Sequence, residues 1–479
     1  MFSPEKVPAD LLSPVLDQLD DRRDLTAAAL VSWSFNRAAT PLLYRTIDSH
    51  IKNNNVLLHP STTLLRRPEL AQYVWHVTET GAVQSLRQFN PRITDDVVAA
   101  LRLCTNLVSA TWVDDTDTPE ANFLPILQVL ITLPLKELII RTHHDVGERA
   151  WTLLNSMKGI CRLSVWSLEW GPPRVLQGWA DLLSSTLTHL ELGRCAGVPP
   201  TILIFVFTKL PLLRDLRLKG APSAAIPAIM ACLPNLIALD TEYLGSGNYR
   251  TPSTPLPRLK KLTVRTGSVD VLGPEQLWTW TSSLIPYPGS LQSFALNSSA
   301  VHGQMTIPHP FIVSLAGRHA VSLREFVVGV AQMSLDSISY LCSKCPVLET
   351  LACSVASPDV PTIAKAIENG NSLRVLELHV QWIQDDAVDL LTSLDSYSGE
   401  STVYTDYSHL VSKSRTVHFT AEEAQALMVR QGSKLRMVQI GESSYAGRWV
   451  RRISSDWQGH VVGQDVVFEV IKDTAHSTQ

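Results

Sequence analysis

The sequence has no surplus of basic residues, no long apolar run and no paired set of cysteines. Lys and Arg total 41 against 45 Asp and Glu, so the formal net charge is −4, which argues against a broad nucleic-acid-binding face. The longest apolar run, around Ile202 to Phe207, is far shorter than the ~20 residues that cross a bilayer. Seven cysteines, an odd number spread over 479 residues, do not resemble a disulfide framework and favour a reducing compartment.

Residues Met1 to Asp10 contain no basic segment followed by an apolar core, so we expect no signal peptide. Together these absences predict a soluble intracellular protein, cytoplasmic or nuclear, with no nucleic acid and no membrane among its partners. Hydrophobic residues make up 45% of the chain and charged residues 18%, so most of the chain should be folded. Its length suffices for about three ordinary domains or for one long solenoid.

Motifs that carry chemistry are also missing. The sequence contains no P-loop, no HExxH pattern and no Ser-His-Asp spacing. Cys342 and Cys345 form the only CxxC, with Cys353 nearby, whereas zinc sites need about four ligands, usually from two such pairs. His143, His144 and Asp145 are adjacent, so their side chains point apart and a loop tip is favoured over a metal site. We therefore expect no catalytic residue, no metal, no cofactor and no enzymatic activity.

What the sequence does contain is a repeat. The unit is an apolar residue, two variable residues, a second apolar residue, one variable residue and a third apolar residue, and neighbouring copies mostly start roughly 23–32 residues apart. Clear copies are Leu135-Leu138-Ile140, Leu187-Leu190-Leu192, Leu213-Leu216-Leu218, Leu236-Leu239-Thr241, Leu259-Leu262-Val264, Leu291-Phe294-Leu296, Leu323-Phe326-Val328, Leu348-Leu351-Cys353 and Leu373-Leu376-Leu378. Weaker copies are Leu107-Ala110-Trp112, Ile160-Leu163-Val165 and Leu435-Val438-Ile440.

The intervals between copies have helical apolar spacing. They are Asp95 to Cys104, Phe123 to Leu133, Thr201 to Leu210, Ser223 to Leu233, Ser334 to Cys345 and Val360 to Asn369. Several end at a proline, which cannot continue a helix and so marks the change to the next strand. Strand–helix units that bury their leucines against similar neighbours predict an α/β fold: a leucine-rich-repeat solenoid with parallel strands on the concave face and helices outside.

The repeat is interrupted before its end. A Ser- and Tyr-rich stretch from Ser393 to Ser414 is predicted to be a mobile insertion. Thr420 and Glu423 have capping-box spacing and open a last helix that ends near Arg430, before Gly432. In the tail, residues 449–451 and 466–468 alternate like a short strand pair that could cap the final repeat.

A different pattern precedes the repeats. Leu11, Leu12, Val15, Leu16 and Leu19 recur at helical spacing. After a charged break, a second apolar stripe includes Leu25, Ala28, Ala29, Val31, Trp33 and Phe35. Two or three short helices cannot bury a large core alone, so this head should lean on a partner or on the next domain.

The residues of this head resemble a known family. Val7 to Leu12, followed by Val15-Leu16 and Leu19, resembles the opening of an F-box, and Asp24-Leu25 with Leu30 to Phe35 resembles its second half. Asn36 to Arg45 is similar to the segment that follows the F-box in many fungal F-box proteins, of the basidiomycete type. The repeats behind the head are similar to those of F-box proteins of the leucine-rich-repeat type.

The resemblance implies that the head binds the Skp-type adaptor of a cullin–RING ubiquitin ligase core while the repeats hold a target protein. The implied contact residues are Pro8, Leu11, Leu12, Val15, Leu16, Leu19, Leu25, Leu30, Val31 and Phe35. Two alternatives stay open: the stripes are the head's own core packed on the first repeat, or the chain is a non-ligase interaction scaffold with a degenerate F-box. The implied segments are an F-box-like head at 1–45, a linker leading into the solenoid at 46–105, the solenoid at 106–440 and a cap at 441–479.

Variable residues of each strand should face the concave side, where a target would bind. The candidates are Arg141, Trp166, Arg194, Arg217, Lys219, Asp240, Glu242, Arg265, His379 and Trp382. Arg217 and Lys219 are expected beside Asp240 and Glu242 on the next strand, where plain cross-strand charge pairs are the alternative. Trp166 and Trp382 are of special interest because exposed Trp is a frequent interaction anchor.

Overall fold

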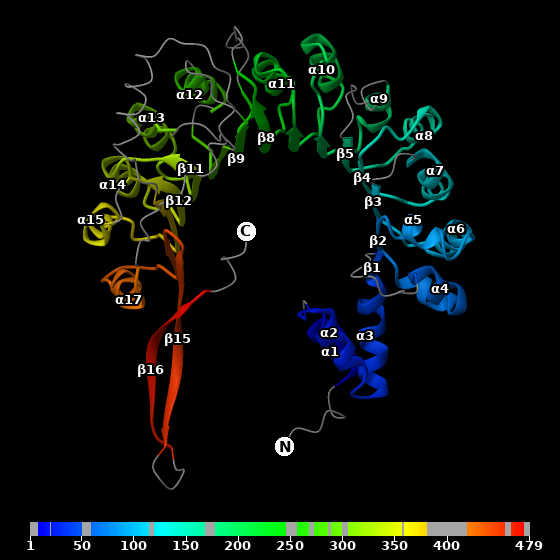
Figure 1. The fold of residues 1–479 in the computed structure, drawn as a ribbon, viewed down its shortest axis with the longest axis horizontal. Coiled ribbons are helices and arrows are strands. Elements are labelled where there is room, and N and C mark those ends of the chain that lie inside the picture. The colour runs from blue at the N-terminus through cyan, green and yellow to red at the C-terminus, as the bar shows by residue number, and fades with distance from the viewer. Residues whose placement is uncertain are drawn as a thin grey trace, which may run out of the picture. The chain divides into compact units, whose positions relative to one another are not determined.

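A computed structural model of the chain describes residues 8–19, 21–49, 59–114, 119–167, 178–245, 256–267, 273–285, 289–298, 305–356, 359–380, 419–455 and 461–473. The chain divides into two compact units, Met1–Leu236 and Ile237–Gln479, which are considered separately below. In each unit most strands are separated by helices, and the helices that connect strands lie on one side of them (Figure 1). The predicted α/β fold with parallel strands is confirmed.

Unit 1 begins with a head of three helices: α1 (Ala9–Leu16), α2 (Arg22–Ala29) and α3 (Trp33–Arg45). Side chains at the starts of two of these helices accept backbone hydrogen bonds, Asp21 from Arg23 N–H at 2.7 Å and Ser32 from Phe35 N–H at 3.3 Å. Such caps satisfy amide groups that have no partner within the helix. The head is continuous with the sheet, because α3 ends at Arg45 and the first strand begins at the next residue.

The strands of unit 1 pair in parallel, each with the next along the chain. They are β1 (Thr46–Ser49), β2 (His76–Thr80), β3 (Ser109–Asp114), β4 (Glu137–Thr142), β5 (Arg162–Ser167), β6 (His189–Leu192) and β7 (Asp215–Leu218). The helices are α4 (Pro60–Arg66), η2 (Pro68–Tyr73), α5 (Ala82–Arg87), α6 (Ile93–Leu103), α7 (Pro119–Leu130), α8 (Glu148–Leu154), α9 (Trp179–Leu183), α10 (Pro200–Phe207), η4 (Ser223–Ala225) and α11 (Ile226–Ala231). The paired strands therefore start within the segment 46–105 that was expected to lead into the solenoid.

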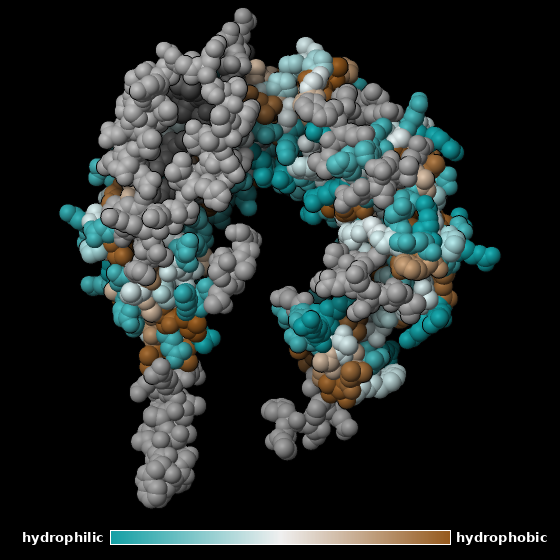
Figure 2. All heavy atoms as spheres, viewed as in Figure 1, coloured by the Kyte–Doolittle hydropathy of each residue, from teal (hydrophilic) through white to brown (hydrophobic). Residues whose placement is uncertain are grey.

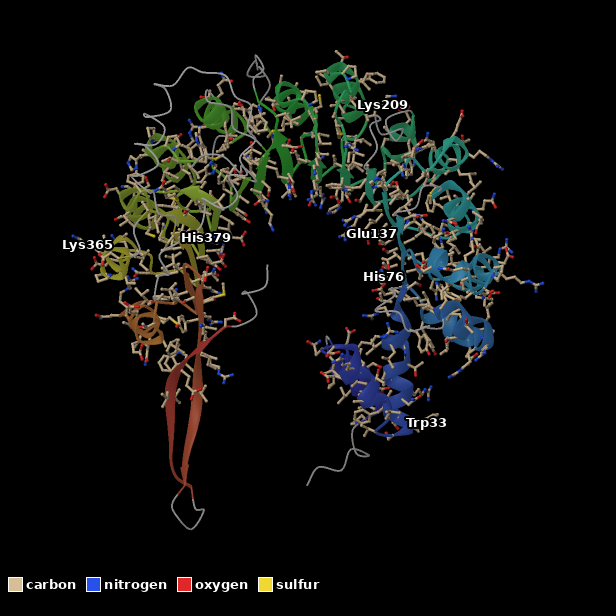
Figure 3. All side chains as sticks on the ribbon, viewed as in Figure 1. Trp33, His76, Glu137, Lys209, Lys365 and His379 are labelled. Carbon is tan, nitrogen blue, oxygen red and sulfur yellow. The ribbon has the colours of Figure 1, made fainter. Side chains whose placement is uncertain are left out.

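The repeated leucines explain this arrangement, because they fill the space between strands and helices. The register places Leu190 beside Leu216 and Leu192 beside Leu218, and all four side chains are buried. Alternate strand residues face the other way. In Figure 3, His76 and Glu137 lie on the side of the strands away from the helices, whereas Lys209 lies on the helix side. Each strand thus has one apolar face and one face, here called the open strand face, that is free of helices.

In unit 2 the strands are again parallel through β14 and become antiparallel in the last two pairings. They are β8 (Ala238–Tyr243), β9 (Lys261–Thr266), β10 (Ser293–Ser298), β11 (Glu325–Gln332), β12 (Thr350–Val355), β13 (Val375–Val380), β14 (Met437–Ile440), β15 (Ser443–Ser455) and β16 (Val461–Lys472). The helices are α12 (Gly273–Leu284), α13 (His309–His319), α14 (Leu335–Lys344), α15 (Val360–Ala366) and α17 (Ala421–Val429). The strand pair predicted in the tail is the hairpin β15–β16.

The last helix forms where its capping signal predicts. Thr420 Oγ1 accepts from Glu423 N–H at 3.3 Å, and Glu423 accepts from Thr420 N–H at 2.9 Å, which completes the capping box of α17. Gly432 follows the helix with φ 78°, a conformation that favours glycine. The predicted insertion from Ser393 to Ser414 lies outside the described residues.

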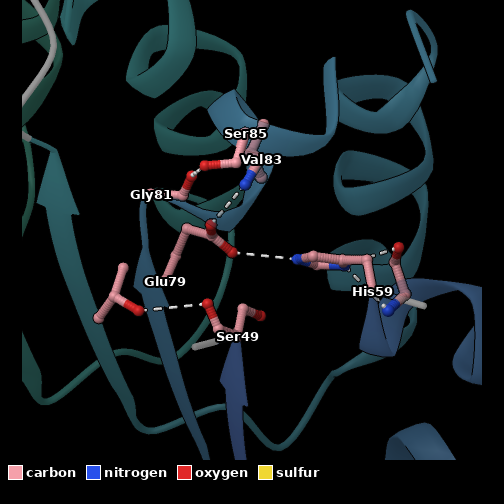
Figure 4. A network of polar contacts seen from close by, with 8 residues as sticks. Ser49, His59, Glu79, Gly81, Val83 and Ser85 are labelled. Carbon is pink, nitrogen blue, oxygen red and sulfur yellow. Dashed lines mark hydrogen bonds and ion pairs between the residues drawn. The ribbon is translucent and has the colours of Figure 1, made fainter. Parts of the chain in front are cut away.

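A buried hydrogen-bonded pair, His59 and Glu79, ties α4, β2 and α5 together in unit 1 (Figure 4). His59 Nε2 lies 3.1 Å from a Glu79 carboxylate oxygen, and each side chain is only 5% exposed. His59 Nδ1 accepts from Ser61 N–H at 3.1 Å, so the proton of a neutral ring resides on Nε2 and is donated to Glu79. The second Glu79 oxygen accepts from Val83 N–H in α5 at 2.8 Å. Both carboxylate oxygens thus have donors although the group is buried.

Aromatic rings form the centre of unit 2. Phe294 on β10 stacks on Phe326 of β11 with centroids 5.5 Å apart, and Phe311 of α13 lies 5.6 Å from Phe294. Trp278 of α12 extends the cluster, 4.8 Å from Phe311. All four side chains are buried. These contacts join two strands to two helices through a single set of rings.

A second buried histidine makes unit 2 sensitive to acid. His319, at the end of α13, is fully buried, and its Nδ1 accepts from Leu291 N–H at 3.1 Å. Burial, with a smaller contribution from the Arg318 charge, lowers its pKa from 6.5 to about 4. Between pH 6.5 and pH 4 the unfolded chain binds more protons at His319 than the folded chain does. The contribution of His319 to the free energy of unfolding is therefore fully present above pH 6.5 and is lost as the pH falls toward 4. The full loss from this group is roughly 3 kcal/mol.

We expect His319→Gln to weaken this pH dependence, because glutamine offers an acceptor to Leu291 N–H and does not titrate. The free energy of unfolding should be measured by urea denaturation at near-neutral and mildly acidic pH for both proteins. The carboxyl groups of the chain titrate in both proteins, so the difference between their two slopes of unfolding free energy against pH isolates His319. Equal slopes would contradict the prediction.

Candidate interaction surfaces

The head exposes a group of apolar side chains, here called the head patch: Leu11, Val15, Leu30, Val31 and Trp33. Their exposed fractions are 56%, 61%, 82%, 55% and 75%. Leu11 and Val15 are four residues apart on α1 and so share a face of that helix. Figure 2 shows hydrophobic residues, in brown, at the surface of the head, and in Figure 3 Trp33 lies at its outer surface. So many exposed large apolar side chains on one small group of helices favour an interaction site.

The structure divides the ten implied contact residues between the inside and the outside of the head. Leu12, Leu16 and Leu25 are buried, together with Ala29, Ala38 and Ala39, in the head's own core. Leu19 and Phe35 pack partly against that core, while Pro8, Leu11, Val15, Leu30 and Val31 are exposed. Helical spacing alone could not separate these groups, and it did not point to Trp33 as a surface residue.

Trp166 on β5 is the centre of a polar cluster on the open strand face of unit 1. The Arg217 guanidinium carbon lies 5.4 Å from the centroid of its ring, and Lys219 Nζ lies 5.5 Å from it. Both distances are within the range of cation–π attraction. Two of the predicted target-binding cations are therefore brought onto the predicted tryptophan.

Gly193, which directly follows β6, makes this contact possible. Its N–H donates to the Val165 carbonyl at 2.9 Å, so it lies beside Trp166 on the neighbouring strand. A Cβ at residue 193 would lie 2.4 Å from the indole. Because glycine has no side chain, the ring can extend across β6 toward Arg217 on β7 and Lys219, which directly follows it. The sequence interpretation missed this residue, although a glycine after the Leu-Glu-Leu of a repeat was a visible signal.

An acidic residue holds one of the cations in place. Glu191 on β6 lies 2.9 Å from Arg217 Nη1, and its other oxygen accepts from Ser164 Oγ at 2.8 Å. Trp166 Nε1 is buried and has no hydrogen-bond partner among the described residues. Of the other candidates in this unit, Arg141 is exposed and Arg194 is half-buried. We call Trp166, Glu191, Arg217 and Lys219 the Trp166 cluster.

The candidates in unit 2 form a smaller set. Arg265 on β9 donates to both carboxylate oxygens of Asp240 on β8, at 2.7 and 2.8 Å, a bidentate pair typical of arginine. Glu242 is half-buried on β8. His379 is half-buried on β13 and lies on the open strand face (Figure 3). Trp382 lies outside the described residues. Asp240 and Arg265 thus form a cross-strand charge pair, which the sequence interpretation did not name.

The CxxC cysteines are buried in unit 2. Cys342 and Cys345 are both free thiols at the end of α14, and Cys353 lies on β12. Burial raises the pKa of Cys342 to about 12 and that of Cys345 to about 11. Zinc binds thiolates, which this environment disfavours. Within the described ranges, no group of three or more His, Cys, Asp or Glu side chains could hold a metal ion.

The described part of the chain also contains no helix that is both long and apolar enough to cross a membrane.

Comparisons with known proteins find only distant likenesses. No protein-family model matches the chain, and no curated protein matches it. The chain is similar to a chain in the crystal structure of the Rad7 and Elc1 complex in yeast, with a TM-score of 0.44 and 16% identity over 78% of this chain and 88% of that chain. It is also similar to a chain in the TLR13-ssRNA13 complex, with a TM-score of 0.35 and 11% identity over 71% and 45% of the two chains. Likenesses of this strength do not assign a function.

Proposed function

We propose that the chain is the substrate-recognition adaptor of an SCF-type cullin–RING ubiquitin ligase. Its head would bind the Skp-type adaptor, and its repeats would hold a target protein. The head patch is the observation that carries this proposal: five large apolar side chains are more than half exposed on a head whose sequence resembles an F-box. Covering them with a partner removes apolar surface from water, at about 25 cal/mol per Å².

The division of the head into core and patch supports the same function. Leu12, Leu16 and Leu25 already hold the three helices together, so the exposed residues are not needed for folding. A preformed surface loses little conformational entropy when a partner binds. The stripe therefore serves two purposes on neighbouring faces of α1, with Leu12 and Leu16 inside and Leu11 and Val15 outside.

The Trp166 cluster supports the second half of the proposal. Tryptophan and arginine are among the residues most often found at energetic centres of interfaces, and here both are held on a strand surface that none of the described helices covers. A target bound there would belong to the same assembly as the ligase core bound at the head. The adaptor would then speed target modification by proximity alone, with no catalysis of its own.

The second candidate function is a repeat scaffold that is not part of a ligase, with a degenerate F-box. The completeness of the head's own core favours it, as does Pro14, which lies inside α1 and removes one of its hydrogen bonds. In this case the head would be a helical cap on the first repeat.

A binding titration of the full chain against a Skp-type adaptor separates the two candidates. We expect tight binding that weakens about 100-fold in the variant Leu11→Asp, Val31→Asp, because the charges would be buried against an apolar partner surface. Both residues are exposed in the free chain, so the fold should persist. A variant at Leu16 would be a poor choice, because that side chain is buried in the head.

The control is Phe89→Asp, Val321→Asp, which places the same charges on apolar residues that are exposed outside the head. It should bind within about twofold of the unaltered chain. Equal weakening in both variants would show that binding does not involve the head patch. If the unaltered chain does not bind the Skp-type adaptor, the repeat scaffold outside a ligase is the candidate function that stands.

A further inference from the structure

A pocket of about 470 Å³ lies in unit 2, among α17, β14 and the hairpin β15–β16. We call it the cap pocket and define it by Arg374, Lys434, Arg436, Arg448, Trp449 and Phe468. Among the described residues, its lining includes four basic residues and no acidic residue. The volume falls within the ~300–1,000 Å³ that is usual for ligand sites.

A glycine shapes the apolar part of the cap pocket. A Cβ on Gly447 would lie 2.3 Å from the Phe468 ring and 2.6 Å from the sulfur of Met428, so both side chains pack directly on its backbone. The Trp449 ring meets Phe468 edge-on with centroids 5.0 Å apart. Trp449 is nevertheless 68% exposed. An aromatic surface that remains in contact with solvent thus borders the basic residues.

The positive charge of the cap pocket arises where a ladder of ion pairs ends. The residues directly before β11, β12 and β13 alternate in sign, and Glu349 pairs with both Arg324 and Arg374. The residue directly before β14 is Arg436, whose N–H donates to the Arg374 carbonyl at 2.8 Å. Strand β15 pairs with β14 in antiparallel register, and Gly447 N–H donates to the Arg436 carbonyl at 2.8 Å, so the described neighbour of Arg436 on β15 is a glycine and not an acidic residue.

The remaining charges do not neutralise this end of the ladder. Among the described residues, neither Lys434 nor Arg436 has an ion-pair partner, and both side chains are exposed. Arg448 meets Glu469 only at 4.0 Å. Unpaired cations beside an aromatic surface attract an anionic ligand.

We infer that the cap pocket binds an acidic segment of a target protein in which carboxylates flank a bulky apolar side chain. This inference rests on the proposed function only in identifying the bound protein as a target. The carboxylates would meet Lys434 and Arg436, and the apolar side chain would pack against Trp449 and Phe468. The pocket holds about one large side chain with its neighbours, so recognition is of a short linear segment.

The test is a selection of random peptides displayed on phage, carried out on the full chain without any ligase component. A counter-selection uses the variant Lys434→Glu, Arg436→Glu. Peptides that survive should be enriched in Asp and Glu beside an aromatic or large aliphatic residue. A surviving pool without this enrichment, or no surviving pool, would overturn the inference.

Fluorescence anisotropy then measures the affinity of a synthetic copy of the most enriched peptide. We expect the peptide to bind at least about tenfold more weakly to the pocket variant Lys434→Glu, Arg436→Glu and to Phe468→Ala. A peptide with Gln and Asn in place of Glu and Asp should bind the unaltered chain more weakly by a similar factor, about tenfold. The control variant Lys260→Glu, Lys365→Glu makes the same change of charge outside the pocket and should bind within about twofold. Equal losses in the control and pocket variants would attribute binding to net charge.

The outcome is independent of the head. If the chain binds the peptide but no Skp-type adaptor, the inference about the cap pocket stands and the proposed ligase function is contradicted. If the chain binds the Skp-type adaptor but no peptide, the proposed ligase function stands and the inference about the cap pocket is contradicted.

Discussion

Replacing Phe294 with alanine is expected to lower the free energy of unfolding of unit 2 by about 4 kcal/mol. The side chain is fully buried on β10 and contacts rings of β11 and α13. Alanine would forfeit the transfer of a large apolar group from water and would leave a cavity that neighbouring rings, held on rigid strands, cannot fill. The measurement is urea denaturation followed by tryptophan fluorescence, to which Trp278 in the same cluster contributes.

The matched control is Phe89→Ala. It makes the same chemical change, but Phe89 is 71% exposed in the loop that follows α5. Its effect should be within about 0.5 kcal/mol. A loss below about 1 kcal/mol in Phe294→Ala would mean that the rings do not form the packed centre described above.

Removing Glu79 is expected to be nearly as costly, about 3–5 kcal/mol for Glu79→Ala. The change leaves His59 buried without its acceptor and leaves Val83 N–H without the carboxylate that caps α5. A buried polar group without a partner costs more than the hydrogen bond contributed. Chemical denaturation of the full chain measures the loss, and hydrogen exchange should show faster opening of α4 and α5.

Two comparisons test whether the burial of His59 and Glu79 causes the expected loss of stability. The exposed pair Arg67–Glu69, with a distance of 2.8 Å and side chains more than half exposed, should contribute little, so Glu69→Ala should leave stability almost unchanged. The double variant His59→Leu, Glu79→Leu removes both buried side-chain polar groups and should recover part of the loss, because Val83 N–H and Ser61 N–H still lack their acceptors. A single variant as stable as the unaltered chain would exclude an important role for the pair.

The candidate surfaces could be predicted only in part. The strand positions of Trp166, Arg217 and Lys219 follow from the alternation of the repeat, and all three meet on the open strand face. The glycine that lets the indole cross β6 was not predicted, because its importance depends on a ring 27 residues earlier in the chain. The cap pocket was missed for the same reason, since it brings Arg374 together with the hairpin that begins at Ser443.

In the head, periodicity predicted helices and apolar stripes but not the direction of each side chain. Leu11 and Leu12 are adjacent and equally apolar, yet one is 56% exposed and the other 3%. Adjacent residues on a helix point about 100° apart, so the position of α1 against α3 decides which of them is buried. That position depends on Ala38 and Ala39, more than twenty residues away in the chain.

The sequence by itself determined the local structure of this protein: strands at the leucine repeats, a capping box before α17 and a strand pair in the tail. Each depends on residues only a few positions apart, whose spacing matches the geometry of one helix or one strand. Only the tertiary structure decided which apolar residues are buried, which charges are paired and where a pocket forms. Those properties depend on the register between strands and on packing between repeats, which place residues from distant parts of the chain within a few ångströms of one another.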